Sequence, residues 1–184
     1  MNDAVVHFFW RNMDHVLAAL LLIARLGDIG TTYLVTPRLR LEANPIVRKL
    51  GWRFAVASLL FCLVPYYNEA VAVMMLMPFL LVSAGNAGRI WFSRAVGEEE
   101  YHAILIRAAR RSRPVQAILP VCLSAAFLAL TGIVVLLFYP DPTMDWGFWL
   151  GSGIVLYGVV IGFYGTLWMR RLFRLARLTP DAAV

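Results

Sequence analysis

The polar side chains that could do chemistry lie inside or beside long apolar runs. Asp28 and Glu42 supply carboxylates, while Thr32 and Asn44 supply hydroxyl and amide oxygens. Oxygen ligands of this kind suit hard cations, and a carboxylate can also serve as a general base. The pattern therefore predicts a polar site. The candidate ligand-binding residues are Asp28, Thr31, Thr32, Glu42, Asn44, Asn86 and Arg89.

Helical spacing predicts two polar stripes. Arg25, Asp28 and Thr32 share one face of the first apolar run, and Asn86 and Arg89 share a face of a later run. Both stripes lie at a similar depth from the ends of their runs. We therefore expect the stripes to face each other, with Asp28 and Arg89 in one network that the residues at 42 and 44 close from the loop below.

Arg25 is an alternative partner for Asp28, because it lies only three residues earlier. A charged side chain near the centre of a bilayer costs about 2.5 to 3.5 kcal/mol on insertion scales, so each needs a partner. An Arg25–Asp28 ion pair that only stabilises the bundle is thus left open.

The amino-acid composition indicates that this chain lies in a lipid bilayer. Its 184 residues are 61% hydrophobic and 15% charged, with a mean hydropathy of +0.71. A soluble domain of this length could not bury so much apolar surface, which predicts a membrane protein. The net charge of +6 does not indicate nucleic-acid binding, because the basic residues cluster at the ends of apolar runs.

The expected fold is an all-α, polytopic transmembrane helical bundle forming a single domain over 1–184. Asn44 followed by Pro45 predicts a helix start, with Asn44 as the N-cap. Glu98 and His102 are expected to form a solvated pair on a surface helix. The predicted spans are about 15–36, 45–66, 69–93, 115–139 and 147–169, and the surface helix is about 98–111.

Orientation follows from the basic residues. Fifteen of the 17 Lys and Arg residues fall in or beside the connections after spans one and three or in the tail after span five. The positive-inside rule then places the N-terminus outside and the C-terminus in the cytoplasm. We expect a multi-pass protein of a bacterial inner membrane.

The central pattern resembles a known group of proteins. Asp28, the threonines at 31 and 32, and Glu42-Ala43-Asn44-Pro45 look like the signature of small prokaryotic multi-span membrane proteins of unknown function, which carry an intramembrane Asp and Thr before a Glu-x-Asn-Pro motif. The resemblance covers about residues 20–55. It implies the location of a site and no particular chemistry.

Three functions are compatible with these patterns. The first is binding or translocation of a cation or polar lipid headgroup in the cytoplasmic half, and the others are a lipid-modifying intramembrane enzyme and a structural or assembly protein without a ligand. Membrane lipids of the anionic inner leaflet are the expected partners. The basic tail 169–178 is expected either to lie along that leaflet or to act only as a stop-transfer anchor. No metal site is predicted, and a cofactor is left open. Gly158-x-x-x-Gly162 predicts close helix packing, internal rather than in a homo-oligomer, although a homo-oligomer is possible.

Overall fold

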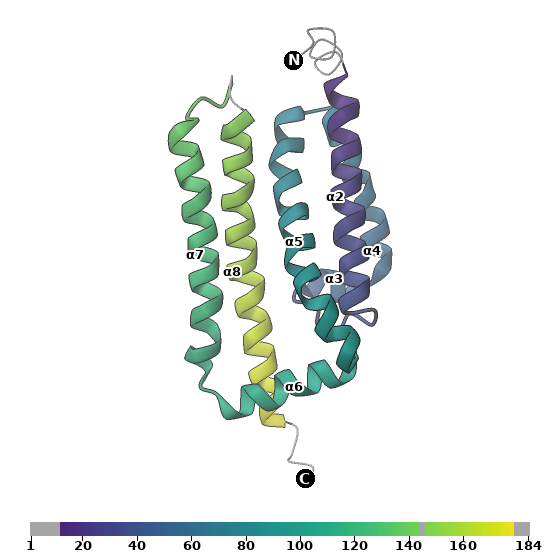
Figure 1. Cartoon of the computed structure of the whole chain (residues 1–184), viewed down its shortest axis with the longest axis vertical. Helices are drawn as coiled ribbons and strands as arrows, with labels where there is room; N and C mark the ends of the chain where they lie inside the picture. The colour runs from purple at the N-terminus through teal and green to yellow at the C-terminus, as the bar shows by residue number, and fades with distance from the viewer. Residues whose placement is uncertain (1–11, 144–145, 179–184) are drawn as a thin grey trace.

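The computed structural model describes residues 12–143 and 146–178, and all regular structure in this part is helical (Figure 1). This confirms the all-α prediction. Four long helices stand side by side, and α6 crosses beneath them at the end that we call the α6 end. The elements are α2 (Met13–Val35), α3 (Pro45–Leu50), α4 (Trp52–Ala57), the 3₁₀ helix η1 (Ser58–Tyr66), α5 (Glu69–Val96), α6 (Glu98–Arg111), α7 (Pro114–Phe138) and α8 (Trp146–Leu178).

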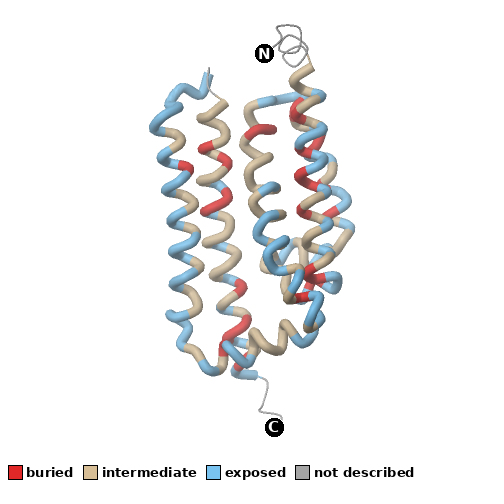
Figure 2. The backbone as a smooth tube through the Cα atoms, viewed as in Figure 1, coloured by how far each residue is buried: buried red, intermediate tan, exposed pale blue. Residues whose placement is uncertain are grey.

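Helices α2, α5, α7 and α8 are long and apolar enough to cross a membrane. Their outward faces carry large apolar side chains, such as Ile23 and Phe127, which are each 65% exposed. Figure 2 shows α7 exposed along most of its length. Large apolar side chains exposed to this extent are unfavourable in water but favourable in contact with lipid acyl chains. The chain is therefore a helical membrane protein.

The predicted second span is not one continuous helix. Residues 45–66 form α3, α4 and η1, with a break at Gly51, where φ is +66°. A left-handed conformation of this kind favours glycine, which has no Cβ to clash. The predicted N-cap is confirmed, since the Asn44 side chain accepts a hydrogen bond of 2.9 Å from the Ile46 N–H.

The broken segment nevertheless runs along α2. Trp52 contacts Tyr33 near one end of α2, and Tyr66 contacts His15 near the other, with ring centroids 5.5 and 5.4 Å apart. The α2 stretch between these contacts rises about 27 Å at 1.5 Å per residue. Six α-helical and nine 3₁₀ residues cover about the same height, because a 3₁₀ helix rises about 2.0 Å per residue. The segment 52–66 is thus an apolar helix shorter than the four long ones, lengthened by its 3₁₀ geometry.

Small residues bring α7 and α8 into close contact. A Cβ at Gly158 would lie 2.9 Å from the Ala125 carbonyl oxygen, and one at Gly132 would lie 2.7 Å from that of Gly151. Neither contact leaves room for a side chain. The glycine stripe of α8 therefore serves internal packing, as predicted.

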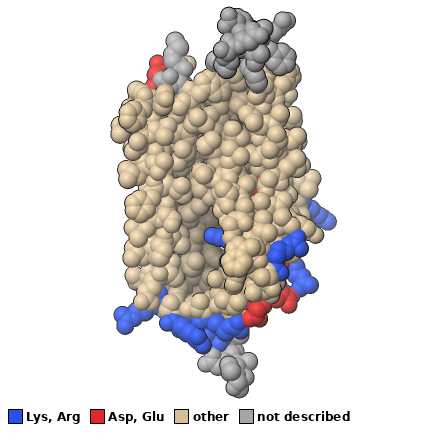
Figure 3. All heavy atoms as spheres, in the orientation of Figure 1, with Lys and Arg blue, Asp and Glu red and all other residues tan. Residues whose placement is uncertain are grey.

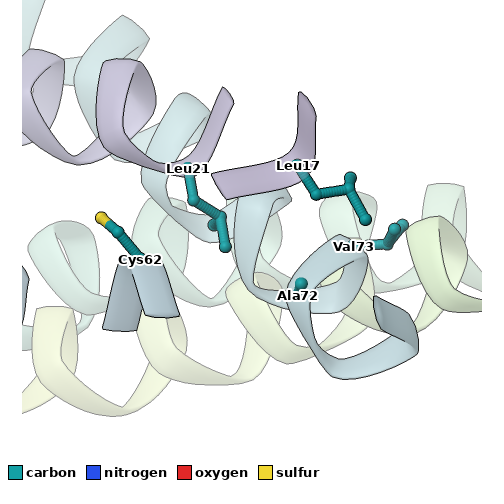
Figure 4. Packing of buried hydrophobic residues seen from close by; sticks show 5 residues of the cluster. All are labelled: Leu17, Leu21, Cys62, Ala72 and Val73. Carbon is teal, nitrogen blue, oxygen red and sulfur yellow. The ribbon is translucent and has the colours of Figure 1, made fainter. Parts of the chain in front are cut away.

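Two apolar clusters hold the bundle at its ends. Figure 4 shows the first, at the end opposite α6, where Leu17 and Leu21 of α2 pack near Cys62, Ala72 and Val73. The second lies at the α6 end and contains Ala109, Trp168, Leu172, Phe173 and Ala176.

The second cluster corrects the expectation for the tail. α6 has the bounds predicted for the surface helix, and α8 continues without a break to Leu178. Leu172 and Ala176 are buried in the cluster with Ala109 of α6, and the Arg110 Nε donates to the Ala176 carbonyl oxygen at 3.1 Å. The apolar face of the tail is therefore covered by α6 rather than by the leaflet.

Candidate functional site

Arg25 and Asp28 form an ion pair one helical turn apart, and both are buried. The Arg25 Nε also donates to the Ser58 Oγ at 2.8 Å, which ties α2 to η1, and the guanidinium stacks over the Phe79 ring at 4.9 Å. The Thr32 Oγ1 donates to Asp28 Oδ1 at 3.4 Å. Both carboxylate oxygens are thus occupied by groups of the protein.

The two polar stripes do face each other. The Asn86 amide nitrogen of α5 donates to the Thr32 Oγ1 of α2 at 2.9 Å. Near the end of α2, the Ser93 Oγ of α5 donates to the Val35 carbonyl oxygen at 2.6 Å. Thr31 instead bonds its own helix, its Oγ1 donating to the Asp28 carbonyl oxygen at 3.2 Å. Thr32 and Asn86 are therefore the predicted site residues that join the two helices.

Arg89 does not join this network. Its side chain is exposed and has no hydrogen bond or ion pair with the described residues. Gly85, one turn earlier on the same face of α5, lies near the Tyr157 hydroxyl of α8, and the charge of Arg89 acts on the same phenol group. Arg89 thus faces the α8 side of α5, whereas Asp28 is already neutralised by Arg25.

Glu42 and Asn44 are used by the loop between α2 and α3. The Asn44 N–H donates to Glu42 Oε1 at 2.7 Å, while the Asn44 side chain caps α3. Burial raises the pKa of Glu42 above its ordinary value, and the Asp28 carboxylate acts in the same direction; the Asn44 N–H and Arg48 oppose them. Glu42 is therefore electrostatically coupled to Asp28 without a hydrogen bond to it.

Glu98 has a role at this end that the sequence did not predict. It is only 8% exposed, and its carboxylate accepts hydrogen bonds from the Thr36 hydroxyl and from the Arg38 and Arg40 N–H groups, the latter two at 2.9 and 2.8 Å. The first residue of α6 thus holds the loop after α2. The expected solvated Glu98–His102 pair is wrong, because the loop covers Glu98; three consecutive glutamates gave no signal for which one it would cover.

Two polar atoms remain unsatisfied near Glu98. The His102 Nε2 and the Arg171 Nη1 are buried and have no hydrogen-bond partner in the described part of the chain. Both side chains lie beside Trp168, with the imidazole 6.1 Å and the guanidinium 5.3 Å from its ring. Burial lowers the pKa of His102, and Arg171 and Arg40 add to this effect, while Glu98 opposes it. The pKa of the imidazole is therefore lowered beside a guanidinium whose Nη1 has no hydrogen-bond partner in the described part of the chain.

The charges of the bundle are distributed unevenly. Figure 3 shows basic groups around the α6 end and a hollow in the face between the lower half of α5 and α8, with a basic group in it. No group of three or more His, Cys, Asp or Glu side chains converges among residues 12–143 and 146–178. The hollow on this face therefore holds a basic group, while acidic groups also lie at the α6 end.

No family model, curated protein or solved structure matches this chain. The resemblance of residues 20–55 to the Glu-x-Asn-Pro group stays a prediction. The remaining guide to function is the distribution of charges. Acidic side chains near basic groups mostly have ion-pair or hydrogen-bond partners in the protein, whereas several arginines have none among the described residues.

Proposed function

We propose that this protein binds the anionic headgroup of a phospholipid on the α8-facing side of α5, with Arg89 as the phosphate ligand. The observation that carries the proposal is Arg89 itself, an exposed arginine inside a membrane helix that has no partner in the described residues. The positive-inside rule would place this site in the cytoplasmic half of an inner membrane.

Depth makes an unpaired arginine at this position costly. Arg89 lies seven residues before the end of α5, or about 10 Å along the helix. A guanidinium at that depth needs an anion or must extend toward the headgroups. Asp28 and Glu98 are engaged by Arg25 and the loop, so a phosphate from the leaflet is the available counter-charge. Arginine suits this role because its fork of donors matches phosphate oxygens.

The same region supports an anion over a cation. Asp28, the acid expected to hold a cation, has both oxygens occupied. Toward the α6 end, the Arg171 Nη1 and the His102 Nε2 are further buried nitrogens without partners. A cation at this site would meet repulsion from Arg89, whereas an anionic headgroup would be attracted by it.

The test is lipid binding by the purified full-length chain, measured by native mass spectrometry with added phosphatidylglycerol. Arg89→Gln should weaken binding about tenfold or more, since a hydrogen bond to a charged group contributes about 1.5 to 3 kcal/mol. Arg94→Gln is the matched control, because Arg94 is exposed near the end of the same helix and should change binding less than about twofold. Equal effects of the two substitutions, or no lipid retained by the wild type, would refute the proposal.

A further inference from the structure

A second cationic feature lies away from Arg89, in a cleft between the start of α7 and the end of α8. Its volume is about 340 Å³. Arg170, Arg174 and Arg177 line one side, and Pro114, Ile118 and Phe173 line the other walls. None of these residues belongs to the α2–α5 network or to the Arg89 face.

The cleft is strongly electropositive. Its three arginines follow one face of α8 at i, i+4 and i+7, are exposed, and have no hydrogen bond or ion pair with any described residue. No acidic residue lines the cleft. The first turn of α7 begins at Pro114 beside the cleft, so the positive end of the helix dipole lies at this side. An anion is therefore the only kind of charge that this geometry would stabilise.

The surroundings of the cleft suit a lipid rather than a free ion. Ile118 and Phe173 give it an apolar wall beside the basic one. Above it, the outward face of α7 is a continuous apolar surface, with Leu119 52% and Phe127 65% exposed. A phosphate in the cleft would leave its acyl chains lying along α7. Basic groups near a membrane surface attract anionic lipids, and several guanidinium groups can share one phosphate.

We infer that this cleft is a binding site for one anionic phospholipid of the leaflet at the α6 end, held by Arg170, Arg174 and Arg177. It is separate from the proposed Arg89 site and does not depend on it. It also differs from a diffuse attraction of a basic tail to a charged surface, because it requires the cleft as well as the charges.

Charge is tested first, in the full-length protein, by native mass spectrometry with phosphatidylglycerol. The double substitution Arg174→Gln with Arg177→Gln should weaken one lipid-binding event about tenfold or more. The control removes two exposed arginines outside the cleft, by Arg53→Gln with Arg111→Gln, and should change binding less than about twofold. Equal losses from the two pairs would show diffuse attraction and overturn the site.

Shape is tested with charge unchanged. Ile118→Trp should fill the cleft and cause the same loss, whereas Leu60→Trp, at an exposed position on η1 away from the cleft, should not. Equal binding by the two tryptophan variants would overturn the proposal. Competition by millimolar inorganic phosphate as effective as that by phosphatidylglycerol would show a free-anion site instead of a lipid site.

The same titration separates the two proposals. Arg89→Gln should leave the lipid-binding event at this cleft intact. If the variants at 174 and 177 remove the same event as Arg89→Gln, there is one site and the inference fails. If Arg89→Gln has no effect while the cleft variants do, the proposed function fails and the cleft remains.

Discussion

Individual charges in this bundle differ in whether the protein supplies their partner. Arg25 is bound by Asp28, Ser58 and the Phe79 ring, so its charge is fully compensated on the protein. Arg89 has the same side chain and also lies in a membrane helix, yet it has no such partner among the described residues. The difference arises because Asp28 lies one turn from Arg25 on the same helix, so the two can pair at little entropic cost. An arginine on another helix has to compete with this local partner for the carboxylate.

Asp28→Asn should be strongly destabilising, because it leaves the Arg25 charge buried without a counter-ion. We expect the free energy of unfolding to fall by about 3 to 5 kcal/mol. Denaturation of the purified protein in detergent would measure it. Arg25→Met combined with Asp28→Leu should recover much of the loss, since breaking a buried pair costs more than replacing it.

Arg89 provides the control for this pair. Asp28→Asn and Arg89→Gln should be additive within about 0.3 to 0.5 kcal/mol, because the two residues share no contact. Strong non-additivity between them would instead support the single network expected from the sequence.

Glu42 makes the stability of the folded protein depend on pH. Burial raises the pKa of this carboxyl above its ordinary value of 4.5, so the folded protein prefers the protonated form. This contribution to stability is complete below pH 4.5 and is lost as the pH rises through the folded-state pKa. Glu42→Gln cannot ionise and keeps an oxygen for the Asn44 N–H, so it should unfold at a higher temperature than the wild type at pH 7.

The advantage of Glu42→Gln should shrink as the pH is lowered below 4.5, where both proteins are neutral at this position. Melting temperatures measured between pH 4 and 8 would show the trend. An advantage that grows toward low pH would contradict the burial argument.

At the level of elements, the α2–α3 loop is held by both α6 and α8. Glu98 accepts two of its N–H groups, while Leu41 and Ala43 pack on the cluster around Leu172. One residue of α6 thus fixes the position of the loop that carries Glu42 and Asn44.

Glu98→Gln should release this loop. The amide replaces one carboxylate oxygen with a donor that faces another N–H, so we expect a loss of about 1.5 to 3 kcal/mol and faster tryptic cleavage after Arg38 and Arg40. Glu99→Gln is the matched control. Its ion pairs with Arg38 and Arg40 are largely exposed, so its removal should cost less than about 1 kcal/mol. Similar cleavage rates for both variants would show that Glu98 does not hold the loop.

The sequence predicted helices better than it predicted contacts between them. Apolar length and the Asn44 cap located the elements, because those signals are local. The 3₁₀ stretch of η1 was missed, since it is set by the height of α2 that the segment must match. The Asp28 partner could not be chosen either, because helical spacing allowed both Arg25 and Arg89, and only the packing of α5 against α8 turns Arg89 away.

Over the whole molecule, the basic groups gather at the α6 end (Figure 3), which the positive-inside rule assigns to the cytoplasm. At the opposite end, the turns at 67–68 and 139–143 carry no Lys or Arg. This asymmetry is a property of the folded bundle, since residues from α3, α6 and α8 contribute to one rim. Both lipid proposals depend on it, because they need the anionic leaflet to meet that rim.

Orientation is tested by labelling single cysteines from outside intact cells. In a chain whose Cys62 and Cys122 are replaced, Thr143→Cys should react with a membrane-impermeant maleimide, because Thr143 is exposed in the turn opposite α6. Ser112→Cys, between α6 and α7, should react only after permeabilisation. The reverse pattern would place the α6 end outside, and the arginines of the cleft would then meet the outer leaflet. Because Thr143 and Ser112 report opposite ends of α7, labelling of both without permeabilisation would mean that α7 does not cross the membrane.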